Sequence, residues 1–420
     1  MGLKFNPLLP TSKPLSVQRN IPVVPKPPSQ QTPNGVSLYQ PKAESAIIRL
    51  NELWNTIIQR SSSNSRAYED YTELKRLCND VVVGNVIAGG RAVLHDWNTK
   101  ARDSIVVCTP EEAHELFAET TKIIVNLPVL VVGYSTTNRL TVDHLLKVLS
   151  TKQTLDVHDF GPPEEGGCDE DGLSAHHPVN RPSAKVIKEF QERDATDGYA
   201  YNLLNIMGIK DNPVPACFTN NINYKVLEMS TGDNGKTSPQ GYIGDLDSSA
   251  RFQLLATTGA VHLPHVDRHG VFTTVLNEQG EKVWIVWPNL TMEELEKQTE
   301  PGAIPPTKPI AIHIEEGSLL IMPPNCLHAP VTMKTCLMTG TMHWNTSHLL
   351  EILQGTKAAI ETPAITNEPV SPQFIPKIEH LLNLWRTGNT VYTWPSQSKY
   401  DECMEILEVS YPSRLAKKKN

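Results

Sequence analysis

Two residues of the sequence, His265 and Asp267, have the types and the spacing of metal ligands. They lie two apart in a stretch that we expect to be extended, and alternate side chains of an extended chain project from the same face. An imidazole and a carboxylate on one face can bind one metal ion. The pair is not sufficient alone, because a chain with 14 histidines and 46 acidic residues contains one or two His-x-acid triplets by chance. His313 and Glu315 form a second triplet, so the surrounding residues must distinguish the two.

A segment further along the chain supplies a third ligand, His328. Gly317 introduces the apolar run 319–322, and the double proline at 323–324 ends it shortly before the histidine. A turn glycine, a short strand and a rigid proline turn fix the position of the side chain that follows. His328 comes 61 residues after the aspartate, which suits antiparallel strands that cross a barrel. Two histidines and one carboxylate with open coordination positions are the ligand set of non-haem Fe(II) oxygenases.

A lysine lies on an expected strand between these ligands. Residues 280–288 alternate in polarity, so Lys282, Trp284 and Val286 share one face of this strand. A lysine on an inward face needs an anion as its partner. In an iron oxygenase, the anion that fits is the distal carboxylate of 2-oxoglutarate.

These motifs follow one another in the order found in a known family. The sequence resembles the Jumonji C (JmjC) family of Fe(II)/2-oxoglutarate oxygenases, most of all its cupin-like members of the asparaginyl-hydroxylase type. The resemblance covers about residues 125–346, and the motifs are dense from 253 to 345. The motifs that carry it are His265-x-Asp267, Lys282-x-Trp284 with Pro288, and Gly317-x5-Pro323-x4-His328.

The resemblance implies a role for each matching residue. Trp284 and Trp344 would line the pocket, with a place in the core as the alternative for both. A tyrosine that contacts the co-substrate in the family matches either Tyr224 or Tyr242. Ser318 departs from the family, which commonly has an acid there. The implied iron ligands are His265, Asp267 and His328, and the implied 2-oxoglutarate contacts are Lys282, Thr274 and Trp344.

The implied function is that of an Fe(II)- and 2-oxoglutarate-dependent dioxygenase that hydroxylates a protein side chain or a small molecule. Oxidation of a carbon that carries nitrogen would instead lead to demethylation. Hydroxylation is favoured over histone demethylation, because the sequence shows no zinc-binding or histone-reader module beside the domain. Two other readings stay open: a non-catalytic JmjC-like scaffold or binding module, and a metal cupin enzyme that uses no 2-oxoglutarate.

The elements that must position these residues are mainly strands. The 33 prolines among 420 residues favour turns and extended segments over an all-helical bundle. We expect a mainly β fold, a double-stranded β-helix (jelly-roll or cupin) core with flanking helices. The expected division is a disordered Pro-rich leader (1–43), an N-terminal helical region (44–124), the JmjC-like barrel (125–346), a C-terminal helical region (347–412) and a basic tail (413–420).

Local patterns predict several individual elements. Apolar residues recur at helical spacing in two helices within 43–79, at 142–149 and at 183–193. Thr109 and Thr291 begin capping boxes, so helices start after them. Strands are expected at 128–133, 155–160 and 319–322, and an exposed loop at 161–182.

The composition limits the partners. A net charge of −8 disfavours non-specific binding of nucleic acid, and no run of 18 apolar residues predicts a membrane span. Seven scattered cysteines without a CxxC motif indicate neither a disulfide framework nor a thiolate zinc site. We expect a soluble, intracellular protein of the nucleus or cytoplasm. Its C-terminal helices, with Leu381, Leu382 and Trp385, would form a homodimer or pack on the protein's own barrel.

Overall fold

The computed structural model describes most of the chain between residues 40 and 410. The expected loop at 161–177, the basic tail and the leader up to residue 39 lie outside the described residues. The described residues are 40–61, 66–83, 105–118, 125–134, 139–160, 178–192, 200–206, 216–229, 246, 250–288, 290–307, 309–366 and 370–410.

Two long antiparallel strands, β7 (Phe272–Trp287) and β10 (Leu327–His343), form the centre of the fold. Each strand bends midway and contributes its two halves to two different sheets. The first sheet, which we call the β9 sheet after its last strand, contains four strands. Their order is β6 (Arg251–Ala256), the second half of β10, the first half of β7, and β9 (Leu319–Met322).

The β8 sheet faces the β9 sheet across the barrel. Its members are the segment 261–265, the first half of β10, the second half of β7, and β8 (Ile310–Ile314). Two four-membered sheets joined by two continuous strands make a double-stranded β-helix. The expected fold class is therefore confirmed.

Gly280 marks the bend of β7. Its φ is +91°, and a Cβ atom added there would lie 2.1 Å from the carbonyl oxygen of Thr335 on β10. Only glycine combines this backbone angle with so close an approach. The pairing of β7 with β10 shifts register around this point, so Gly280 lies in a β-bulge.

Further strands extend the β9 sheet at both edges. β5, β3 and β4 follow β6 on one edge, and β2 and β1 follow β9 on the other. β1 lies in the region expected to be helical, and β4 lies in the stretch expected to be a loop. The sequence did not predict these two strands, because they are too short to show an alternating pattern of apolar residues. Their bounds are β1 Val106–Cys108, β2 Val129–Val131, β3 Thr154–Asp159, β4 Val179–Pro182 and β5 Tyr201–Ile206.

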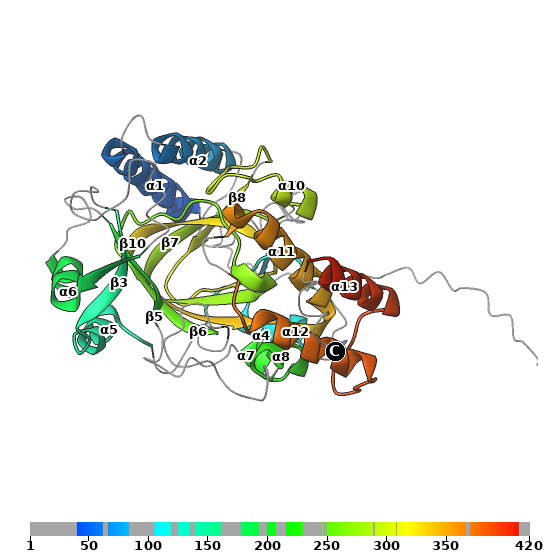
Figure 1. Cartoon of the computed structure of the whole chain (residues 1–420). Coiled ribbons are helices and arrows are strands. Elements are labelled where there is room, and N and C mark those ends of the chain that lie inside the picture. The colour runs from blue at the N-terminus through cyan, green and yellow to red at the C-terminus, as the bar shows by residue number, and fades with distance from the viewer. Residues whose placement is uncertain are drawn as a thin grey trace, which may run out of the picture.

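Helices cover the barrel on several sides (Figure 1). The outer face of the β8 sheet packs against α1 and α2, and the outer face of the β9 sheet against α4 and α7. The expected helices and both capping boxes are confirmed. The N-terminal and middle helices are α1 Gln40–Arg60, α2 Arg66–Val83, α4 Pro110–Leu116, α5 Val142–Leu149, α6 Ser183–Glu192, α7 Ala216–Thr219, η4 Ile222–Lys225, α8 Val226–Met229 and α10 Met292–Glu296.

The C-terminal helices lie on the opposite side of the molecule from α5 and α6 (Figure 1). Leu381, Leu382 and Trp385 are buried within the chain's own core, so the single chain already covers them. The homodimer stays a prediction. No helix of the described residues is long and apolar enough to cross a membrane. The bounds are η7 Thr346–His348, α11 Leu349–Glu361, η8 Pro363–Ile365, α12 Phe374–Arg386 and α13 Gln397–Ser410.

Glu281 ties α1 to the β8 sheet. Its carboxylate accepts two hydrogen bonds from Arg49 of α1, at 2.6 and 2.7 Å, and one from Nε2 of His313 on β8, at 2.6 Å. Burial disfavours the ionised carboxylate, but the hydrogen bonds from His313 and Arg49 outweigh it and lower the pKa of Glu281 to about 2.

We predict that Glu281→Ala lowers the free energy of unfolding by about 2 kcal/mol, because it removes the shared acceptor of a partly buried network. Denaturant unfolding at neutral pH measures the loss. The control is Glu73→Ala, which breaks an exposed ion pair with Arg76 and should cost less than about 0.5 kcal/mol. Because the folded pKa lies below the ordinary value of 4.5, the stabilisation is complete above pH 4.5. It should fade as the pH falls towards 2, and an unchanged difference between wild type and variant there would contradict this account.

Candidate metal centre

The backbones of His265 and His328 pair directly with each other. The N–H of His265 donates to the carbonyl oxygen of His328 at 3.0 Å, and the N–H of His328 donates to that of His265 at 2.9 Å. This reciprocal pair joins the segment 261–265 to the first half of β10. It brings the two imidazole rings to a centroid distance of 4.5 Å.

Each imidazole is oriented by a carbonyl group two residues earlier in the chain. Nδ1 of His265 lies 2.8 Å from the oxygen of Leu263, and Nδ1 of His328 lies 3.0 Å from the oxygen of Cys326. A carbonyl only accepts hydrogen bonds, so Nδ1 carries the proton in both rings. The lone pair of each neutral ring is therefore on Nε2, and this is the arrangement in which histidine binds metals.

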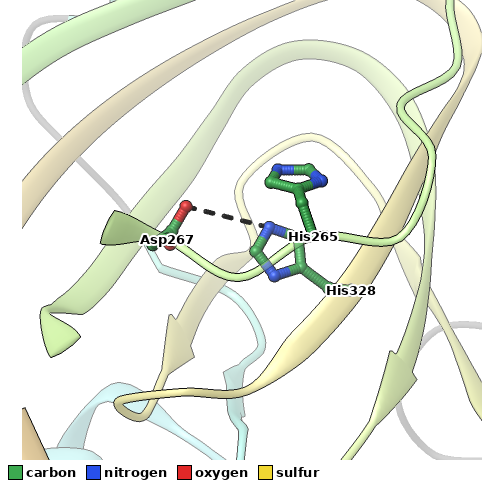
Figure 2. A group of neighbouring side chains, drawn as sticks. All are labelled: His265, Asp267 and His328. Atoms are coloured by element: carbon green, nitrogen blue, oxygen red, sulfur yellow. Dashed lines mark ion pairs between the residues drawn. The ribbon is translucent and has the colours of Figure 1, made fainter. Parts of the chain in front are cut away.

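Asp267 adds a carboxylate to the two imidazoles. Its backbone is extended, and although it precedes the 3₁₀-helix η6 (Arg268–Gly270), its side chain forms no capping hydrogen bond. Its Oδ1 lies 3.9 Å from Nε2 of His328. Figure 2 shows this contact and the three side chains gathered around one point.

The three donor atoms fit a single metal ion. They lie within 4.8 Å of one another, and metal bonds of about 2.0–2.2 Å allow ligand atoms up to about 4 Å apart. Adjacent ligands of one ion would lie about 3 Å apart at such bond lengths, so the side chains would move closer together by up to about 2 Å to bind it. The structure thus brings together the three residues that the sequence predicts as ligands, as a possible metal site.

The C-terminal region holds the turn that follows Asp267. The N–H of Ser371 donates to Nε2 of His269 at 2.7 Å, and the indole N–H of Trp344 donates to the carbonyl oxygen of His269 at 3.0 Å. His269 has a φ of +62°, which a non-glycine residue adopts only when its surroundings enforce it. Gly270 packs so closely on α11 that an added Cβ would lie 2.6 Å from Cα of Ile352.

The ligand residues line a cavity inside the barrel. About 680 Å³ of it is free of protein atoms, the open mouth included. Trp284 stacks on the ring of His328 with a centroid distance of 4.9 Å and an angle of 21°, which helps to fix the plane of that imidazole. The lining residues are Asn202, Leu204, Phe252, Leu254, His262, His265, Asp267, Arg268, Thr273, Val275, Lys282, Trp284, His328, Pro330 and Met342.

Lys282 lies in this cavity as a buried cation. Its side chain is 3 % exposed, and burial lowers the pKa of its ammonium group. In the described part of the chain, no carboxylate forms an ion pair with it. A buried charge without a counter-charge is costly, so the position suits an anionic ligand.

Thr273, and not Thr274, faces the cavity. The hydroxyl of Thr274 is 2.6 Å from that of Thr341, on the outer side of the β9 sheet. Thr274 was expected here because the resemblance to the JmjC family implies a co-substrate contact at its position. The bulge at Gly280 sets which of the two adjacent threonines faces inward. Thr273 Oγ1 is buried and has no hydrogen-bond partner within the described chain.

Two other expected pocket residues lie outside the cavity. Trp344 is fully buried and packs edge-on against Phe374, so it has the core position that the sequence left open as its alternative. Tyr224 is buried among the aromatic rings under α4, where burial raises the pKa of its phenol. Tyr242 lies outside the described residues.

The second His-x-acid triplet has a different role. His313 bonds to Glu281 in the network with α1, away from the cavity. Two lining residues, Asn202 and His262, were not expected from the sequence. Asn202 lies on β5, far from every motif, and only the sheet pairing of β5 with β6 brings it to the cavity.

A comparison with curated proteins found no match. A comparison with family models found one for residues 243–351, described as the JmjC domain. The matched segment contains β6 to β10, and with them all three candidate ligands and Lys282. The part of the barrel from β6 to β10 is therefore a JmjC domain.

Proposed function

We propose that this protein is an Fe(II)- and 2-oxoglutarate-dependent oxygenase. The observation that carries the proposal is the presence, in one cavity, of a two-histidine, one-carboxylate donor set and a buried lysine that pairs with no carboxylate of the described residues. The donor set matches the facial triad that leaves coordination positions open. The lysine matches a co-substrate that brings a carboxylate.

His265, Asp267 and His328 would hold the iron. Bound there, Fe(II) would supply the activation of O2, with 2-oxoglutarate decarboxylated to succinate as the substrate is oxidised. The protein contributes two neutral imidazoles with preset orientations. It also contributes a carboxylate that is not used for helix capping.

Lys282 and Thr273 would hold the co-substrate. The ammonium group of Lys282 pairs with the distal carboxylate, and the hydroxyl of Thr273, which lacks a protein partner, donates a hydrogen bond to it. Burial strengthens this ion pair, because the site has a lower dielectric constant than water. Phe252, Leu254 and Met342 line the cavity with apolar surface that excludes water from the reacting groups.

Hydroxylation of a protein side chain or of a small molecule is the proposed outcome. Demethylation follows from the same oxidation when the attacked carbon carries nitrogen. The two alternative functions are a non-catalytic scaffold and a metal cupin enzyme that uses no 2-oxoglutarate. The variants below distinguish both from the proposed oxygenase.

Metal binding tests the ligand assignment. We predict that His265→Ala and Asp267→Ala each weaken Mn(II) binding at least about tenfold, measured by electron paramagnetic resonance titration. Glu315→Ala, in the other His-x-acid triplet, and His144→Ala, on the exposed face of α5, are the controls. If the Glu315 variant lost Mn(II) binding and the Asp267 variant kept it, the metal would belong to the His313–Glu315 triplet, and the proposed ligand set would be wrong.

Lys282→Ala tests the use of 2-oxoglutarate. We predict a loss of affinity for 2-oxoglutarate of about 30-fold or more, because a buried charge pair is broken, while Mn(II) binding is retained. Calorimetry and succinate production measure the effect, and Lys334→Ala on the exposed side of β10 is the matched control. Activity that survives in Lys282→Ala would favour the keto-acid-independent cupin. Wild-type protein that binds iron but neither binds 2-oxoglutarate nor forms succinate would favour the scaffold.

Two adjacent threonines give a matched pair of variants. We predict that Thr273→Val weakens 2-oxoglutarate binding about fivefold, because one hydrogen bond to the co-substrate is lost. Thr274→Val should leave this affinity within about twofold, since its hydroxyl bonds to Thr341 outside the cavity. The opposite ranking of the two dissociation constants would show that the co-substrate lies elsewhere.

A further inference from the structure

Three polar residues that line the cavity, Asn202, His262 and Arg268, have no part in the proposed binding of iron or co-substrate, and the first two bond to each other. Asn202 and His262 are both buried and line the same cavity as the three ligands. The amide Nδ2 of Asn202 donates to Nε2 of His262 at 2.7 Å. The ring of His262 lies 5.5 Å from that of His265, so the pair adjoins the metal cluster.

The amide oxygen of Asn202 is the unusual group of this pair. The amide has this orientation when Nε2 of His262 carries the lone pair, and the oxygen is then directed elsewhere. Oδ1 is buried and has no hydrogen-bond partner in the part of the chain that the structure describes. A buried acceptor without a donor is unfavourable, and a bound molecule that supplies an N–H or O–H group removes this cost.

The co-substrate does not supply that donor. At neutral pH, 2-oxoglutarate carries two carboxylates and a ketone, all of which accept hydrogen bonds. Asn202 Oδ1 is also an acceptor, so the two groups do not pair. The donor is therefore a water molecule or a group of the molecule that is oxidised.

The charge of the lining limits what this molecule is. Among the described lining residues, Asp267 is the one acid, and it belongs to the candidate ligand set. Lys282 and Arg268 are the lining cations. A cationic group would find no carboxylate left to balance it, whereas a neutral N–H group needs none.

We propose that Asn202 is a specificity-determining residue and that its Oδ1 accepts a hydrogen bond from a neutral N–H or O–H group of the primary substrate. His262 is a positioning residue, which presents the amide with its oxygen unsatisfied. The inference rests on the proposed function and deepens it, because it favours neutral hydrogen-bond donors over the ammonium groups of lysine side chains.

Small probes of matched shape test the proposal. The protein is loaded with Mn(II) and N-oxalylglycine, an inert analogue of 2-oxoglutarate. The Mn(II)-induced relaxation of probe protons then reports binding close to the metal. Propionamide offers a neutral N–H group, 2-butanone has the same shape without a donor, and propylammonium carries a charge. We expect propionamide to bind about fivefold or more tightly than either of the others.

Two substitutions separate recognition from shape. Asn202→Leu keeps the size of the side chain but removes the acceptor, and should bring the three probes within about twofold of one another. Asn202→Asp adds a negative charge and should shift the preference to propylammonium. Asn180→Leu, on the exposed strand β4, is the control that should keep the wild-type preference. Thermal unfolding and the Mn(II) spectrum verify each fold, and either Asn202 variant suffices if the other does not fold.

The outcomes distinguish this inference from the proposed function. Wild-type protein that fails to bind Mn(II) or N-oxalylglycine overturns the proposed function, and this inference with it. If both bind, equal relaxation of propionamide and 2-butanone overturns the inference alone. A preference for propionamide that persists in both Asn202 variants also overturns the inference. So does an absence of relaxation for all three probes, because water would then be the partner of Asn202.

Discussion

The reciprocal pair of backbone hydrogen bonds between His265 and His328 is the contact on which the site depends. It joins two segments that are distant in the sequence and places two imidazoles side by side. The same β10 strand pairs with β7, where His328 lies opposite Val286 and Thr332 lies opposite Lys282. One strand therefore fixes both histidines relative to the lysine, and a slip of one residue would turn these side chains to the other face.

The electrostatics of the cavity are incomplete in the protein alone. Lys282 is buried with no ion-pair partner among the residues that the structure describes, and Asp267 forms no capping bond. A divalent cation and a dicarboxylate, added to this aspartate and lysine, bring the four charges to zero. This balance would offset the cost of burying the charged lysine. The dicarboxylate would pair with its ammonium group, and the metal ion with the aspartate. The C-terminal helices contribute by holding the strained turn at His269, directly after the carboxylate.

The sequence predicts which three candidate ligands come together, but it predicts the pocket walls poorly. The fold class, the three converging ligands and the inward position of Lys282 follow from local rules, namely alternation along a strand, a turn glycine and a double proline. The resemblance implied Thr274 and not Thr273, because a motif position does not record the bulge at Gly280, where the close approach of β10 changes which threonine faces inward. Asn202 could not be found at all, since no local pattern records that β5 pairs beside β6. Trp344 was ambiguous, because tryptophan serves equally well as core and as pocket wall, and its contacts with His269 and Phe374 decide for the core.

A crystal structure of the protein with Mn(II) and N-oxalylglycine tests the central claim most directly. The account predicts anomalous density for one metal ion, bonded at about 2.0–2.2 Å to His265, Asp267 and His328. It further predicts that the free carboxylate of N-oxalylglycine contacts Nζ of Lys282 and the hydroxyl of Thr273. Metal density away from these three side chains, or a carboxylate that leaves Lys282 without a partner, would contradict the account.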